Sequence, residues 1–68
     1  MSVQVKLNGE PRELPDGATL AVAVGELTAA ATGVAAAVNG DVVPRSSWTV
    51  TFLRDSDQVE VVTAVQGG

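Results

Sequence analysis

The sequence contains no cysteine and no histidine, and these two absences remove most of the usual catalytic and metal-binding chemistry. Without cysteine the chain has no disulfide, no thiolate metal ligand and no cysteine nucleophile. Without histidine it lacks the commonest general base, so its serines have no partner for a catalytic triad. No Gly-rich loop opens a helix that could bind phosphate. The composition therefore predicts a protein without catalytic activity of its own and without a metal site.

Basic residues and long apolar runs are also scarce. Four Lys and Arg residues face eight Asp and Glu residues, and this net charge of −4 argues against nucleic acid as a partner, because phosphate binding needs a positive stripe. No apolar run approaches the roughly 20 residues of a membrane span, and the N-terminus lacks a signal-peptide pattern. We therefore expect a cytoplasmic protein with no membrane contact. The negative charge favours a partner with a basic docking surface, or it serves solubility alone.

The 68 residues are enough for one small domain, and 46% hydrophobic against 18% charged residues predicts that it folds. Val3 to Leu7 alternates apolar and polar residues, as a half-buried strand does. Asn8-Gly9 predicts a tight hairpin turn into a second strand, Glu10 to Leu14. Pro11 makes that second strand short or places it at a sheet edge.

A single main helix is expected after the Pro15-Asp16-Gly17 turn, with Thr19 as its N-cap. Its apolar face at helical spacing consists of Leu20, Ala23, Val24, Leu27 and Ala31. Val34 to Val38 is an apolar run typical of a central strand. Asn39-Gly40 then predicts a second tight turn into a short strand that ends at Pro44.

The last third of the chain predicts a short helical turn, a loop and a final strand. Ser46-Ser47-Trp48 opens the helical turn, in which Trp48 anchors the core or a loop. Val50 to Leu53 is a brief strand or a loop. Asp55-Ser56-Asp57 is a solvated turn that lacks the spacing of a calcium loop, and Gln58 to Ala64 is the last strand. The element order predicts an α+β fold with a mixed sheet of four to five strands on one main helix, in which the first and last strands are parallel neighbours.

The last strand also offers a candidate docking surface. If Val59, Val61 and Thr63 face the core, alternate residues must face outward. The outward residues are then Glu60, Val62 and Ala64. An exposed Val62 beside Ala64 is typical of a partner surface. A register shifted by one residue, or a loop around Trp48 that covers these side chains, is the alternative.

The strand leads into a tail that ends in Gly67-Gly68. Two final glycines present a carboxylate on a segment without Cβ atoms, which is narrow enough to enter another protein's active-site channel. The carboxylate is ionised at neutral pH and must be activated before it can react, most naturally by adenylation with ATP. We expect residues 1–64 to form the domain and 65–68 a flexible tail, in which Val65, Gln66 and Gly67 thread and Gly68 reacts. A frayed end is the alternative.

Three segments resemble the ThiS family, the sulfur carrier proteins of thiamin biosynthesis. They are A-V-N-G-D-V-V-P-R-S-S-W at Ala37 to Trp48, D-S-D-Q-V at Asp55 to Val59, and Gly67-Gly68. The resemblance covers the whole chain and implies a ubiquitin-like β-grasp fold. It also implies that a ThiF-like adenylyltransferase uses ATP and magnesium to adenylate Gly68, and that a sulfur donor protein then displaces AMP to leave a thiocarboxylate. A ThiG-like thiazole synthase would take that sulfur. The carrier itself would bind no cofactor stably and would be a monomer when free.

Two departures from the family pattern bear on this interpretation. The family often has D-G-D where this chain has Asp55-Ser56-Asp57, and Glu60 stands where relatives tend to be apolar, so the docking surface is expected to be smaller or shifted. A MoaD-like carrier of molybdopterin synthesis is an alternative, although MoaD proteins usually have a proline in the tail and Ala64-Val65-Gln66 has none. A ubiquitin-like modifier of other proteins and an unreactive binding module are further alternatives.

Overall fold

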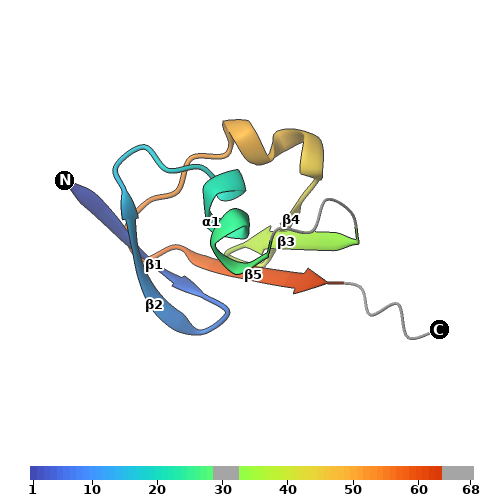
Figure 1. Cartoon of the computed structure of the whole chain (residues 1–68), viewed down its shortest axis with the longest axis horizontal. Helices are drawn as coiled ribbons and strands as arrows, with labels where there is room; N and C mark the ends of the chain where they lie inside the picture. The colour runs from blue at the N-terminus through green and yellow to red at the C-terminus, as the bar shows by residue number, and fades with distance from the viewer. Residues whose placement is uncertain (29–32, 64–68) are drawn as a thin grey trace.

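The computed structural model describes residues 1–28 and 33–63, which form one mixed five-stranded sheet with its helices on one face (Figure 1). In chain order the elements are β1 (Ser2–Leu7), β2 (Glu10–Pro15), α1 (Leu20–Leu27), β3 (Val34–Val38), β4 (Asp41–Val43), the 3₁₀ helix η1 (Arg45–Val50) and β5 (Gln58–Thr63). The strand order is β2-β1-β5-β3-β4. The predicted α+β fold and the parallel pairing of the first and last strands are confirmed, since β1 and β5 pair in parallel.

Both Asn-Gly pairs form the tight turns that the sequence predicts. Asn8 and Gly9 have φ angles of 52° and 85°, and Asn39 and Gly40 have 52° and 88°. These left-handed conformations are those of a type I′ turn, which Asn and Gly adopt at low cost. The first turn joins β1 to β2, and Pro11 lies in β2 at the edge of the sheet as expected.

Helix α1 crosses the sheet and buries a narrower face than its sequence pattern predicts. Thr19 occupies the N-cap with extended backbone, but its side chain makes no capping hydrogen bond; its carbonyl accepts from the Val22 and Ala23 N–H groups. Leu20, Ala23 and Val24 are buried. Leu27 is exposed, contrary to the prediction, because α1 ends at that residue. Ala31 lies outside the described residues.

The core lies between α1, η1 and the inner face of the sheet. Its buried members are Val3, Val5, Leu7, Leu14, Ala18, Leu20, Ala23, Val24, Ala36, Trp48, Leu53, Val59 and Val61. Alternate residues of β1 and the first part of β5 are buried, as the period-two pattern predicts. Thr63 was predicted to face the core but is exposed. The reason is its place at the end of β5, which runs past α1 (Figure 1).

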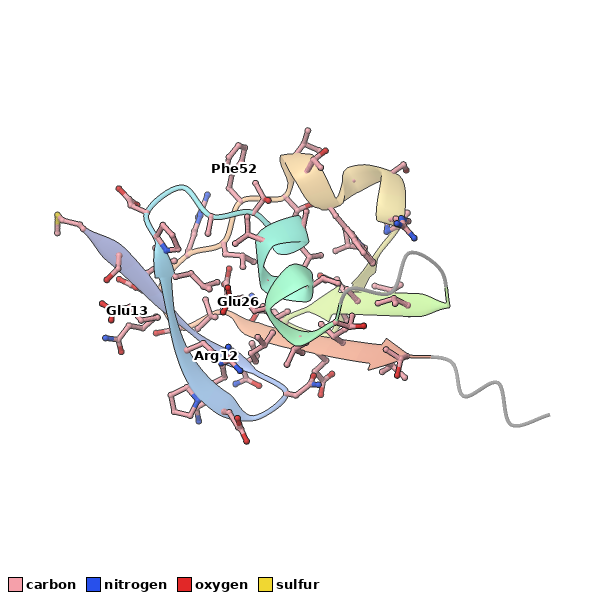
Figure 2. The ribbon with its side chains drawn as sticks, in the orientation of Figure 1. Arg12, Glu13, Glu26 and Phe52 are labelled. Carbon is pink, nitrogen blue, oxygen red and sulfur yellow. The ribbon has the colours of Figure 1, made fainter. Side chains whose placement is uncertain are left out.

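The segment after β4 is anchored by Trp48, as predicted. The residue is 7% exposed, and its indole Nε1 donates a hydrogen bond of 2.9 Å to the Val43 carbonyl. The helical turn is η1, which begins at Arg45 and includes Val50, a residue that the sequence had assigned to a brief strand or loop. Beyond it the chain forms a single antiparallel bridge between Phe52 and Thr19. The exposed Phe52 ring points away from the body of the domain (Figure 2).

The predicted Asp55-Ser56-Asp57 turn is confirmed, and its carboxylates bind backbone amides. Asp55 Oδ1 accepts from the Gln4 N–H at 2.8 Å, and Asp57 Oδ2 accepts from the Arg54 N–H at 2.9 Å. Ser56 has a φ of 73°, a left-handed conformation that favours glycine, so serine is accommodated here at some strain. The turn therefore fixes the start of β5 against β1.

Candidate functional site

The end of β5 is where the structure meets the predicted reactive tail. Ala64 and the tail residues Val65 to Gly68 lie outside the described residues, as does the predicted boundary between residues 64 and 65. The structure does place Glu60 and Val62, both exposed on β5 as expected. The candidate site is therefore built from β5, from the residues that hold it and from the surface beside it.

Strand β5 is the central strand of the sheet, but its two neighbours support it unequally. With β3 it pairs over its whole length after Gln58, from Val38 opposite Val59 to Val34 opposite Thr63. With β1 it pairs only at Gln58 and Val59, because β1 turns away at Asn8. The far half of β5 thus lacks a backbone partner from β1.

The side chain of Asn8 replaces that missing partner. Its Oδ1 accepts a hydrogen bond of 2.7 Å from the Val61 N–H, and its Nδ2 donates one of 3.1 Å to the Val61 carbonyl. The Asn8 backbone N–H also donates to the Val59 carbonyl at 2.9 Å. One amide side chain therefore extends the β1–β5 ladder by one step, because it offers the same donor and acceptor as a peptide group.

Asn39 holds the other end of β5 in a similar way. Its Oδ1 accepts from the Gln58 N–H at 2.9 Å, while its Nδ2 donates to Asp57 Oδ1 at 3.0 Å. Its backbone N–H donates to the Gln58 carbonyl at 2.7 Å. The asparagines of both tight turns thus bind the strand that leads to the tail, a role that the sequence analysis missed.

An apolar surface lies on the outer face of the sheet, opposite the helices. Val62 on β5 is 64% exposed and sits opposite Ala35 of β3; Ala37 of β3 sits opposite Val42 of β4, which is 75% exposed. We call Ala35, Ala37, Val42 and Val62 the outer patch. Residues directly opposite each other in a sheet share a face, so these four side chains point the same way.

Glu60 interrupts the outer patch, because it lies opposite Ala37 on the same face. The alternation within β5 predicts Val62 and Glu60, but it does not predict the other three members of the patch. Their inclusion depends on β3 lying between β4 and β5, which the pattern of each strand alone does not reveal.

The described residues offer an exposed apolar surface beside the end of β5. Residues 1–28 and 33–63 contain no group of three His, Cys, Asp or Glu side chains that could hold a metal. No pocket is found in the structure as described. None of the helices in these two stretches is long and apolar enough to cross a membrane. The arrangement can present the end of β5, and the residues that follow it in the chain, beside the exposed outer patch.

A five-stranded mixed sheet of this order, with one helix across it and parallel first and last strands, is a ubiquitin-like β-grasp domain. The same fold is found in the crystal structure of a thiamine biosynthesis protein (ThiS) from Geobacter metallireducens. The two match with a TM-score of 0.78 and 26% identity, over 97% of this chain and 100% of that one. The sequence model of the ThiS family matches residues 5–68, and the chain belongs to this family.

Two named relatives show how the chain compares in length. The sulfur carrier protein ThiS of Escherichia coli K12 is 27% identical over 66 residues, which are 97% of this chain and 100% of that protein. The thiazole synthase of Paramagnetospirillum magneticum AMB-1 is 32% identical over 66 residues, again 97% of this chain. That match spans only 20% of the thiazole synthase, so the chain corresponds to about a fifth of its length.

Proposed function

We propose that this chain is the sulfur carrier protein of thiamin biosynthesis and that the carboxylate of Gly68 carries the sulfur. The observation that carries the proposal is the family match, which runs from residue 5 through Gly67 and Gly68. The Escherichia coli relative, which is named a sulfur carrier protein, matches over its entire length. The absence of cysteine and histidine supports a role as the substrate of other enzymes rather than as an enzyme.

In this proposal Gly68 is activated and then loaded with sulfur. A ThiF-like adenylyltransferase uses ATP and magnesium to join the Gly68 carboxylate to AMP, with release of pyrophosphate. A sulfur donor protein then supplies the sulfur nucleophile, which attacks the acyl carbon of Gly68 and expels AMP. Hydrosulfide gives the thiocarboxylate directly, whereas a protein persulfide gives an acyl disulfide whose S–S bond a thiol then reduces, releasing the donor. Gly67, Gln66 and Val65 thread into the partner, and the glycines are suited to this because they have no side chain beyond Cα. The carrier acts in the cytoplasm as a monomer and binds no cofactor stably.

A ThiG-like thiazole synthase is the proposed acceptor of the sulfur. The Paramagnetospirillum magneticum relative supports this choice, because a protein named thiazole synthase contains a segment similar to nearly all of this chain. In that protein the carrier-like segment and the rest of the thiazole synthase belong to one polypeptide. A role close to thiazole formation therefore has more support than a role in molybdopterin synthesis or in the modification of other proteins.

The experiment that tests this function is the intact mass of the chain after incubation. The purified protein is mixed with a ThiF-like adenylyltransferase, ATP, magnesium and a sulfur donor. The expected result is a mass gain equal to the replacement of one oxygen by one sulfur, confined to the C-terminal peptide and dependent on ATP. An unchanged mass with an enzyme that modifies another ThiS protein would contradict the proposal. Denaturant-resistant adducts to other proteins would instead favour a ubiquitin-like modifier.

Partner enzymes must dock close to the end of β5. Val65 to Gly68 span only about 13 Å when fully extended, at about 3.3 Å per residue, so an active site that holds Gly68 cannot lie far from the folded body. Ordering each of these residues costs about 1–2 kcal/mol, which contacts of the body must offset. The outer patch is the proposed docking surface, with Val62 as its member nearest to the end of β5 and with Glu60 on the same face. Ala64, which the sequence also predicts for this surface, lies outside the described residues.

Val62→Asp is expected to weaken binding to the adenylyltransferase while the free energy of unfolding changes by less than about 0.5 kcal/mol, because Val62 is exposed. Phe52→Asp is the matched control: Phe52 is 64% exposed, as Val62 is, but it lies beyond η1, where it bridges Thr19 at the start of α1 on the helix-covered side of the sheet. Calorimetric titration with the enzyme and urea denaturation measure the two quantities. Equal weakening by both variants would argue against the outer patch as the docking surface.

A further inference from the structure

The segment Val43 to Trp48 holds an arginine at the surface beside a buried ring. Trp48 is buried and hydrogen-bonded to the Val43 carbonyl, so its indole has a fixed position. The guanidinium carbon of Arg45 lies 5.7 Å from the centroid of that ring, while the Arg45 residue as a whole is exposed. A cation over the face of an indole is attracted by the ring electrons. Arg45 is therefore an exposed cation whose orientation is restrained.

No carboxylate of the described residues pairs with this cation. Within residues 1–28 and 33–63 one ion pair forms, between Arg12 and Glu26, whose Nη1 and Oε1 atoms are 3.1 Å apart (Figure 2). That pair links β2 to α1. Arg45 belongs to a chain with eight acidic residues and a net charge of −4, yet its charge is left uncompensated by an ion pair in the described part of the structure.

Arg45 lies at the end of the sheet from which the tail departs. Strand β3 runs antiparallel to both β4 and β5, so β4 and β5 run in the same direction. Val43, the last residue of β4, is level with Val61, because both lie opposite Ala36. The chain therefore enters η1 at Arg45 on the same side on which β5 ends, and Figure 1 shows the start of η1 and the arrowhead of β5 at that end.

We propose that Arg45 is a docking residue that pairs with a carboxylate of the adenylyltransferase, an inference that rests on the proposed function. The guanidinium fork binds a carboxylate through two parallel hydrogen bonds, and a stacked fork loses less freedom on binding than a mobile one. The phosphates of ATP are a less suitable anion for Arg45 than a carboxylate of the enzyme. The phosphates must reach Gly68, which lies five residues past Thr63 and about 16 Å away along an extended chain, whereas Arg45 lies on the folded body.

The test compares the kinetics of pyrophosphate release by the adenylyltransferase with ATP and increasing carrier concentration. Arg45→Ala is expected to raise KM for the carrier about fivefold, as loss of a surface ion pair does, and Arg45→Glu about tenfold or more. The value of kcat should stay unchanged, because Arg45 does not touch the reacting atoms. Added salt should raise KM of the original protein more steeply than KM of Arg45→Ala.

Arg54→Glu is the matched control. It makes the same charge change at another exposed arginine, but Arg54 precedes the turn before β5 and so lies at the opposite end of that strand. Its KM should stay within about twofold of the original value, as for a charge outside the contact. Trp48 is the single tryptophan, so its fluorescence during thermal melting shows whether each variant is folded. Should Arg45→Glu unfold, Arg45→Ala and Arg45→Lys serve in its place.

Several results would overturn the inference. Equal KM increases for Arg45→Glu and Arg54→Glu would show an effect of net charge, and unchanged KM in all Arg45 variants would show no contact. A lower KM for Arg45→Ala would mean that Arg45 holds the carboxylate of the chain's own tail. Each of these leaves the proposed function intact. If the original protein releases no pyrophosphate with the enzyme, the proposed function fails as well.

Discussion

Deletion of Gly67 and Gly68 is expected to abolish sulfur loading completely and to leave the fold intact. In the proposed function the carboxylate of Gly68 must reach the adenylation site, and the shortened chain would present that of Gln66, two residues and about 7 Å too short. The domain should remain folded, because the described core ends with Val61 on β5. Intact mass after the loading reaction measures the first effect, and urea denaturation measures the second.

Extension of the chain beyond Gly68 provides the matched control for this deletion. A single added alanine leaves both glycines in place but replaces the reacting residue, so it should also block loading. A protein that acts only as an unreactive binding module would tolerate both changes. Full loading of either variant would show that Gly68 is not the acceptor of sulfur.

Asn8→Ala is expected to destabilise the domain by about 2–3 kcal/mol, a large fraction of the stability of so small a protein. The change removes both side-chain hydrogen bonds to Val61, whose side chain lies in the core. It also places alanine at a φ of 52°, a left-handed conformation that costs most residues about 1–2 kcal/mol. Urea denaturation followed by Trp48 fluorescence measures the free energy of unfolding.

Asn8→Gly separates the two causes. Glycine adopts the left-handed conformation freely, so this variant loses only the hydrogen bonds and should be more stable than Asn8→Ala. A free energy of unfolding for Asn8→Ala within about 0.5 kcal/mol of the original value would show that the amide contacts with Val61 are dispensable.

The sequence predicts those parts of the fold that depend on neighbouring residues. The alternation in β1 predicts its buried face, and the Asn-Gly pairs predict left-handed turns, because both signals act within a few residues. The contact between Asn8 and Val61 could not be predicted in this way. The two residues are 53 positions apart, and they meet only because β1 and β5 are neighbours.

Errors at element ends have a similar physical origin. Leu27 and Thr63 follow the apolar and alternating patterns of their elements, yet both are exposed. Each pattern gives the direction of a side chain but not whether another layer lies above it at that point. In the candidate site, too, the pattern of one strand predicts some residues, while others depend on which strands are neighbours. Val62 could be predicted from its own strand, whereas Val42 joins the outer patch only through the order of three strands.

The parallel register of β1 and β5 has a practical consequence for engineering. Lys6, near the end of β1, lies opposite Gln58, the first residue of β5, and the two strands run in the same direction. Ser2 at the start of β1 and Thr63 at the end of β5 therefore lie at opposite ends of the domain (Figure 1). An affinity tag or fluorescent protein attached before Met1 would not contact an enzyme that binds at the end of β5. Such fusions should therefore serve as probes for partner capture, whereas the same cargo placed behind Gly68 would obstruct it.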